Sequence, residues 1–176
     1  VDIDGGAVYR VDLISQQILR FAMPTRPGAL AACQHGGVMV ALERGLAYLD
    51  PETGEVTQAA QPLEGRSDVR FNDGKCDRRG RFYCGTLDLQ EQRPIGALYR
   101  FEDQHTARVM DEGFTVSNGL DWSPDSRTLY FTDSPQRTIY QYDYDLESGS
   151  MCRRRPFVTL GEDEGYPDGL SVDSKG

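Results

Sequence analysis

The chain has 176 residues, of which 38% are hydrophobic and 27% charged, which is enough for one ordinary domain with a real core. Acidic residues outnumber basic ones by 28 to 19, and the resulting net charge of −9 argues against a nucleic-acid partner. No apolar run approaches the roughly 18 residues that a membrane-spanning helix needs, so no membrane partner is expected either.

Short stretches of alternating apolar and polar residues recur along the chain, each bounded by Gly, Pro, Asp, Asn or Ser. This alternation at period 2 is typical of half-buried β-strands. In chain order, the predicted strands are AVYRVDL (7–13), GVMVAL (37–42), RFYCGTL (81–87), GALYRF (96–101), TLYFTD (128–133) and TIYQYDYD (138–145). No window of ten or more residues carries a helical apolar stripe, so the sequence predicts an all-β fold.

The strands also repeat. A tetrapeptide ending in an acid begins at Tyr9, Ala47, Tyr99 and Tyr140. A polar residue before glycine starts a strand at three places, led by Asn72, Asn118 and Asp168, and these positions are 46 and 50 residues apart. A period in the mid-forties with four short strands per unit is typical of the blades of a β-propeller.

The repeat predicts how the chain is divided, as one partial propeller domain over 1–176. We expect a partial blade at 1–23, then complete blades at about 24–69, 70–116 and 117–165, and the first strand of a further blade at 166–176. At about 45 residues per blade, the whole protein would be a six-bladed propeller of roughly 270–300 residues. This chain would then cover about three full blades and parts of two more.

The same repeat indicates a site. In a propeller the first strand of each blade lines the central channel, so residues at the same phase converge around the axis. Arg70, Asn72, Asn118 and Asp168 occupy that phase. Taken singly, Asn-Gly and Asp-Gly steps are most often plain turns, but three of them in one phase favour a site. Their oxygen donors suit a hard cation such as Ca²⁺, Mg²⁺ or Mn²⁺.

Several motifs together resemble the regucalcin/gluconolactonase family of six-bladed propellers, which hydrolyse sugar lactones with a divalent cation: RFNDGK, SNGLDWSPD, YFTDS, YQYDYD and YPDGLSVD. The resemblance implies that Asn118 is a metal ligand, and that Asp168 is both a second ligand and the general base. It also implies that Arg70 and Asn72 hold the substrate or the metal-bound water. The single cation would be Ca²⁺ or Zn²⁺, with Mg²⁺ or Mn²⁺ as alternatives.

Two family features fall outside the matched motifs. Members of the family also use a glutamate ligand from the first blade, and the repeat places the equivalent position upstream of Val1. Some members contact the sugar through an acidic residue shortly after the Gly-Thr that closes the second strand. The loop over 86–94 offers Asp88, Gln90 or Glu91 for that contact, and the sequence leaves the choice open.

Rival chemistries have little support in the sequence. There is no G-x-S-x-G motif, and the only histidines, His35 and His105, lie in turn-like segments outside the channel phase. The four cysteines show neither a C-x-x-C pair nor metal spacing, which favours reduced thiols in a cytoplasmic protein. We therefore expect a metal-dependent lactonase whose partner is a small sugar lactone, neutral rather than acidic because of the protein's negative charge. The alternatives are a non-catalytic Ca²⁺-binding propeller and a metal-dependent hydrolase of aryl esters or phosphotriesters.

Overall fold

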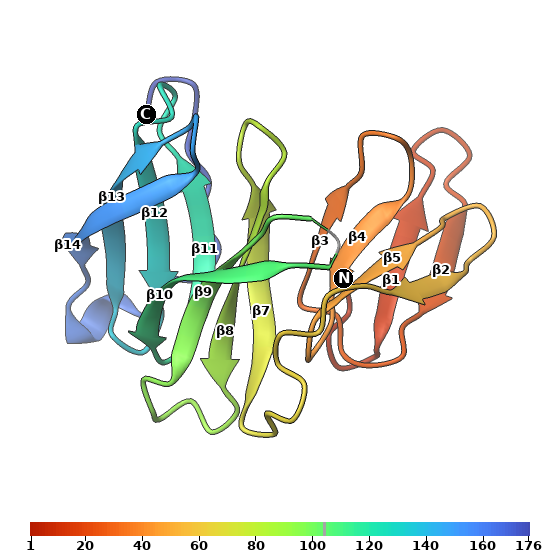
Figure 1. Ribbon diagram of the computed structural model, residues 1–176, viewed down its shortest axis with the longest axis horizontal. Coiled ribbons are helices and arrows are strands. Elements are labelled where there is room, and N and C mark those ends of the chain that lie inside the picture. The colour runs from red at the N-terminus through yellow and green to blue at the C-terminus, as the bar shows by residue number, and fades with distance from the viewer. Residues whose placement is uncertain (104) are drawn as a thin grey trace.

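The structure, a computed structural model, describes residues 1–103 and 105–176. In these residues the strands form four antiparallel sheets (Figure 1). The first sheet pairs β1 (Ala7–Val11) with β2 (Ile18–Ala22). The second contains β3 (Ala29–Ala32), β4 (Val38–Ala41), β5 (Leu46–Leu49) and β6 (Val56–Gln58). The third contains β7 (Val69–Cys76), β8 (Phe82–Asp88), β9 (Gly96–Phe101) and β10 (Ala107–Phe114). The fourth contains β11 (Ser117–Trp122), β12 (Thr128–Asp133), β13 (Thr138–Asp145) and β14 (Ser150–Thr159).

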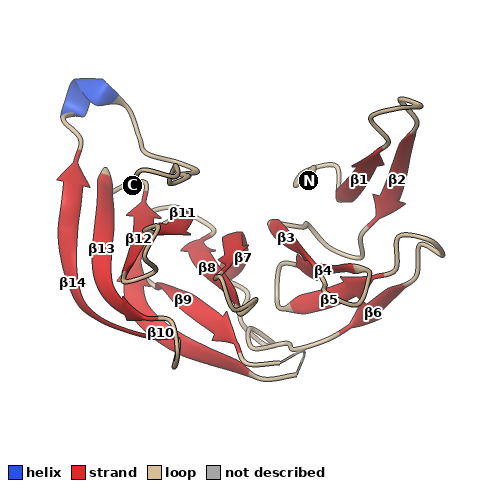
Figure 2. Ribbon diagram, turned by 90° about the horizontal axis from the view of Figure 1, so that it is seen from above, coloured by secondary structure: helices blue, strands red, loops and turns tan. Residues whose placement is uncertain are grey.

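The sheets stand side by side in an arc. Figure 2 shows β3, β7 and β11 nearest the centre of the arc, while β6, β10 and β14 lie at its periphery. Within each four-stranded sheet, consecutive strands are hydrogen-bonded neighbours, so every blade is a simple meander from the centre outward. The described residues add a single short 3₁₀ helix, η1 (Glu162–Glu164). The structure therefore confirms the all-β prediction and shows part of a β-propeller.

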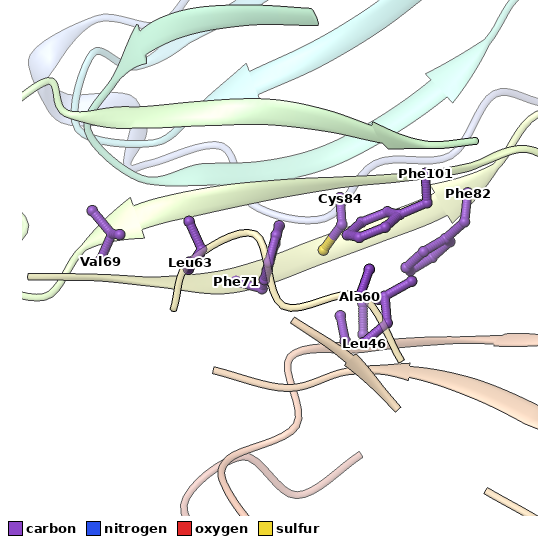
Figure 3. Close-up of a cluster of buried hydrophobic side chains, with 10 residues drawn as sticks. Leu46, Ala60, Leu63, Val69, Phe71, Phe82, Cys84 and Phe101 are labelled. Carbon is purple, nitrogen blue, oxygen red and sulfur yellow. The ribbon is translucent and has the colours of Figure 1, made fainter. Parts of the chain in front are cut away.

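The hydrophobic core lies between neighbouring sheets rather than within one. One cluster, shown in Figure 3, joins the second and third sheets around Leu46, Phe71 and Phe101. Another joins the third and fourth sheets around Tyr83, Trp122 and Phe131. Burying each large side chain contributes about 1.5–3 kcal/mol, so blade-to-blade packing is a main source of stability. β8, one of the strands predicted from alternation, is buried at every residue, because its side chains pack into both of these clusters.

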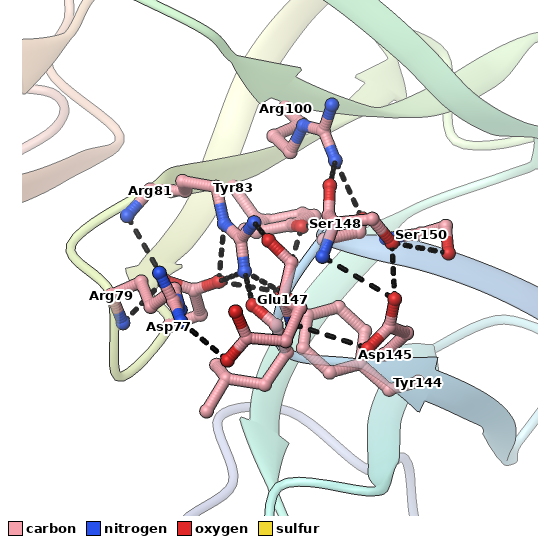
Figure 4. A network of polar contacts seen from close by, with 12 residues as sticks. Asp77, Arg79, Arg81, Tyr83, Arg100, Tyr144, Asp145, Glu147, Ser148 and Ser150 are labelled. Carbon is pink, nitrogen blue, oxygen red and sulfur yellow. Dashed lines mark hydrogen bonds and ion pairs between the residues drawn. The ribbon is translucent and has the colours of Figure 1, made fainter.

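A buried polar network reinforces the contact between the third and fourth sheets (Figure 4). The Asp77 carboxylate accepts hydrogen bonds from Arg81 Nε at 2.7 Å and from the Tyr144 hydroxyl at 2.6 Å. Arg100 Nη1 donates to the carbonyl of Gly149 at 2.6 Å, and Tyr83 donates to the same oxygen at 2.9 Å. Because the Asp77 side chain is fully buried, these donors are what make its charge tolerable inside the protein.

Residues 166–176 were expected to contain the first strand of a further blade, but they form no strand. They lie alongside β11 through two contacts. Gly119 N donates to Asp168 O at 3.1 Å, and Val172 N donates to the Asp121 carboxylate at 2.9 Å. A side-chain acceptor replaces a backbone partner in the second contact, so no regular ladder develops.

Candidate functional site

Two β-bulges present the candidate residues to the centre of the arc. In β7 the pairing with β8 shifts between Phe71 and Gly74, so Asn72 and Asp73 form the bulge. In β11 the pairing with β12 shifts between Asn118 and Leu120. A bulge redirects side chains that a regular strand would alternate between its faces, and bulges often accompany functional sites. Asn72-Asp73-Gly74 is therefore a feature inside a strand, and not the tight turn that its composition resembles.

A cavity of about 560 Å³ opens beside these bulges. It is lined by all four residues predicted from the repeat, Arg70, Asn72, Asn118 and Asp168. Its other lining residues are Ile3, Leu87, Glu91, Val116, Ser134, Pro135, Tyr166 and Pro167. The four polar side chains come from the third sheet, the fourth sheet and the segment after η1, so three successive parts of the repeat meet in one cavity.

Hydrogen bonds connect the candidate residues across the sheets. Arg70 Nη1 donates to Asn72 Oδ1 at 2.9 Å. Asn72 Nδ2 in turn donates to Asn118 Oδ1 at 3.0 Å and to the Ser117 carbonyl at 2.9 Å. These contacts determine which end of each amide is oxygen, because an amide nitrogen can only donate. Asn118 therefore keeps its oxygen on the side of the cavity that Asn72 also lines.

Asp168 reaches the cavity from the segment beside β11. Its carbonyl oxygen accepts the hydrogen bond from Gly119 N at 3.1 Å, which holds its backbone next to Asn118. Its side chain is exposed, and within residues 1–103 and 105–176 no hydrogen bond or ion pair reaches its carboxylate. The Asp168 carboxylate is thus available to a ligand.

Charge is distributed unevenly around the cavity. Burial raises the pKa of Asp73, and the nearby charge of Asp168 raises it further. Burial also lowers the pKa of the Arg70 guanidinium, with a contribution from neighbouring Arg26. Asp73 and Asp168 thus lie close enough for their negative charges to interact, and a cation bound beside them would relieve that repulsion. Arg70 supplies a positive charge to the lining of the same cavity.

The structure distinguishes among the three candidates in the loop over 86–94. Asp88 is fully buried and pairs with Arg93 at 2.7 Å, and hydrogen bonds from Arg93 hold its pKa well below the usual range. It therefore cannot contact a substrate in the cavity. Gln90 does not line the cavity, whereas Glu91 does. Glu91 adopts a positive φ of 54°, an uncommon backbone conformation that accompanies its placement at the cavity.

Sequence reasoning missed two polar side chains in the lining. Ser134 follows β12 within the quoted motif YFTDS, but nothing in its pattern distinguishes it from a turn residue. Tyr166 precedes Pro167, and its ring lies 4.4 Å from the Arg137 guanidinium. Arg137 also donates to the Gly161 carbonyl at 2.8 Å and so anchors the segment that carries Tyr166. Both placements depend on contacts between segments that are distant in sequence.

The donor set fits a hard divalent cation. Asn118 offers an amide oxygen of determined orientation, and Asp168 offers an unpaired carboxylate. Such oxygens are the ligands that Ca²⁺, Mg²⁺ and Mn²⁺ prefer. In the described part of the chain no three His, Cys, Asp or Glu side chains cluster as a metal site. The candidate cation ligands are therefore the Asn118 amide and the Asp168 carboxylate.

Comparison with known proteins places the fold and site in context. The family model for the SMP-30/gluconolactonase/LRE-like region matches residues 1–176. The chain belongs to this family. Regucalcin from Xenopus laevis is 36% identical over 182 aligned residues, which cover 100% of this chain and 60% of that protein. The chain thus spans about 60% of the length of the regucalcins it matches.

Two solved structures of the family have the same fold. A luciferin-regenerating enzyme superposes with a TM-score of 0.91 at 25% identity, covering 100% of this chain and 62% of that one. Regucalcin from Agrobacterium tumefaciens, described as a calcium-binding protein, gives 0.92 at 23% identity, covering 99% and 59%. These superpositions show that the chain has the fold of these proteins. None of the described residues forms a helix long and apolar enough to cross a bilayer.

Proposed function

We propose that the protein hydrolyses sugar lactones with the help of one divalent cation. The observation that carries this proposal is the grouping of Arg70 and Asn72 beside Asn118 and Asp168 in one cavity. A purely structural cation needs oxygen ligands, but it does not need an arginine directed at the same space. The combination fits a site that binds both a cation and an oxygen-rich substrate.

Asn118 and Asp168 would hold the cation, which we propose to be Ca²⁺ or Zn²⁺, with Mg²⁺ or Mn²⁺ as alternatives. When bound, it would supply Lewis acidity that polarises a lactone carbonyl and acidifies a water molecule. Asn118 is suited to the role because its oxygen already has a defined direction, set by hydrogen bonds at both ends of its amide.

Asp168 would also act as the general base. Its carboxylate is exposed to the cavity and has no competing hydrogen bond among the described residues, so it can accept a proton from the attacking water. The backbone contact with Gly119 limits how far the residue can move, which matters because base catalysis depends on hydrogen-bond reach.

Arg70 and Glu91 would position the substrate. Arg70 uses one nitrogen, Nη1, for the contacts with Phe71 O and Asn72 Oδ1, which leaves its other donors for hydroxyl or carbonyl oxygens of a lactone. Glu91 can accept hydrogen bonds from sugar hydroxyl groups. A cavity of about 560 Å³ accommodates a monosaccharide-sized ligand. The net charge of −9 favours a neutral lactone over an acidic one.

The apolar part of the same cavity favours a second candidate. Leu87, Val116, Pro135 and Tyr166 line it together with the polar residues, and they would accommodate an aryl group. Aryl esters and phosphotriesters are therefore the alternative substrate class. We propose a cytoplasmic location for either activity, because the four cysteines are all free thiols in the structure.

The direct test is hydrolysis by the intact protein, including any chain beyond these 176 residues. A pH-stat records acid release from five- and six-membered sugar lactones and from an aryl lactone, with and without each of the four cations. We expect turnover of sugar lactones that is lost on chelation and restored by one added cation. Turnover of the aryl lactone alone would favour the second candidate.

Two variants separate the roles of the proposed residues. Arg70→Ala should lower kcat/KM by about 10- to 100-fold, the loss expected for one charged hydrogen bond, with little change in cation affinity. Arg66→Ala is the matched control, because Arg66 pairs with Asp68 outside the cavity. Asp168→Asn should retain some cation binding while kcat falls by about 10²–10⁴-fold. Cation binding without turnover of any substrate would instead support the non-catalytic Ca²⁺-binding propeller.

A further inference from the structure

Ser134 lines the cavity, and the proposed mechanism assigns no role of its own to this residue. It follows the last residue of β12, and its own N–H donates to the Val116 carbonyl at 3.1 Å. Its hydroxyl makes two contacts with the candidate site. Asn118 Nδ2 lies 2.7 Å from Ser134 Oγ, and Ser134 Oγ lies 2.6 Å from the Pro167 carbonyl oxygen.

The direction of each hydrogen bond follows from chemistry. A carbonyl oxygen can only accept, so the single hydroxyl proton of Ser134 goes to Pro167. Ser134 Oγ then accepts from Asn118 Nδ2 through a lone pair. At the other end of the same amide, Asn118 Oδ1 accepts from Asn72 Nδ2 at 3.0 Å. A flipped Asn118 amide would set two NH₂ groups against each other and two acceptors against each other, so one orientation is strongly preferred.

The contact with Pro167 constrains the neighbouring residue. Proline has no N–H and a fixed φ, so its carbonyl is its one main-chain hydrogen-bonding group. Holding that oxygen fixes the plane of the peptide that joins Pro167 to Asp168. The next carbonyl, that of Asp168, accepts from Gly119 N at 3.1 Å. The backbone of Asp168 is thereby held on both sides.

We propose that Ser134 is a positioning residue that couples the two cation-binding residues, orienting the Asn118 amide through one hydrogen bond and fixing the Asp168 backbone through the other. This inference rests on the cation site of the proposed function. It assigns the coupling to a single hydroxyl that does not itself need to touch the ion. Outer partners of this kind typically change metal affinity by about 10- to 100-fold when removed.

An isosteric pair of variants isolates the hydroxyl. Ser134→Thr keeps a hydroxyl on the same carbon. Ser134→Val has the shape of the threonine variant but lacks the hydroxyl. Ser134→Ala adds a third variant without extra bulk. Thr138→Val is the matched control, because Thr138 is a buried residue of the same sheet whose hydroxyl bonds to the Gln136 carbonyl and to Thr159, away from the cavity.

The measurement is isothermal titration calorimetry of the intact protein with CaCl₂, ZnCl₂, MgCl₂ and MnCl₂, using the tightest cation for all variants. We expect Ser134→Val and Ser134→Ala to raise Kd by about 10- to 100-fold, and Ser134→Thr to stay within about threefold of wild type. Lactonase assays should show that KM for the lactone changes little, and that kcat partly recovers at high cation concentration. Thr138→Val should match wild type in Kd.

The outcomes distinguish a failure of the proposed role of Ser134 from a failure of the proposed cation site. If wild type and Ser134→Val bind the cation equally while Asn118→Ala does not, the role of Ser134 is overturned and the cation site stands. A Ser134→Thr protein as weak as Ser134→Val would overturn it as well, because the hydroxyl would then not be the cause. If wild type binds none of the four cations, the proposed function itself fails.

Discussion

Gly119 offers a sharp test of the geometry, because it lies between the two proposed cation ligands. A Cβ at this position would stand 2.3 Å from Leu170 N and 2.6 Å from Asp168 O. Both obstacles are backbone atoms, so no side chain can simply rotate away. Gly119→Ala should therefore displace the segment that carries Asp168 from β11 and stretch the hydrogen bond between Gly119 N and Asp168 O.

The size of the displacement sets the expected effect. Ordinary van der Waals contact begins near 3.4 Å, so the segment must retreat from Gly119 by about 1 Å. A misplacement of about 1 Å in a catalytic arrangement can cost about 10²-fold in rate. We expect kcat/KM for the lactone to fall by about 10²-fold, and the cation Kd to rise, because the separation of Asn118 and Asp168 changes with the segment.

Gly169→Ala is the matched control for this prediction. Among the described residues, a Cβ on Gly169 meets no heavy atom within 4 Å, and its backbone is outside the left-handed region. It should leave both quantities near wild type. The assays are calorimetric cation titration and pH-stat kinetics on both variants. Indistinguishable behaviour of Gly119→Ala and Gly169→Ala would refute the close approach of Asp168 to β11.

Two further predictions concern the contacts between blades. Tyr144→Phe removes the hydroxyl that donates to the buried Asp77 carboxylate at 2.6 Å, so urea unfolding should show a loss of about 1.5–3 kcal/mol. Tyr9→Phe, at an exposed tyrosine, should cost almost nothing, and equal losses would contradict this reading. For Asp121, burial opposes ionisation, but the hydrogen bond from Lys75 at 2.6 Å and that from Val172 N more than offset it, so its pKa is lowered. A carboxyl group with a lowered pKa in the folded state stabilises the protein at pH values above its unfolded pKa of 3.8, and this stabilisation is lost as pH falls through the folded pKa. Urea unfolding should therefore show Asp121→Asn to be most destabilising near pH 7. A gap to wild type that stays constant down to about pH 3 would contradict this.

Much of the architecture could be predicted from the sequence because it depends on local patterns. Alternation identified strands that the structure contains, among them β8, β9, β12 and β13. The repeat brought Arg70, Asn118 and Asp168 into one phase, and they line one cavity. Both signals follow from geometry that every blade shares, so a single chain carries several copies of each.

The remainder depended on contacts that no local pattern encodes. In the sequence Asp88 is a candidate for contact with the sugar, yet its buried carboxylate pairs with Arg93. Ser134 resembles a turn residue in the sequence, yet it joins Asn118, 16 residues before it, to Pro167, 33 residues after it. These roles follow from how one segment docks on another, and that docking is set by side-chain packing rather than by periodicity.

The cavity is assembled from separate blades, and this has a thermodynamic consequence. Arg70 and Asn72 belong to the third sheet, Asn118 to the fourth, and Asp168 to the segment after it. A cation held by Asn118 and Asp168 would connect the fourth sheet to the segment that follows it, and cation binding would be thermodynamically linked to the packing of these parts against each other. At a concentration one hundred times Kd, such a ligand adds about 2.7 kcal/mol to the stability of the assembled state. Cation supply would then control how firmly the blades hold together, as well as how fast the site turns over.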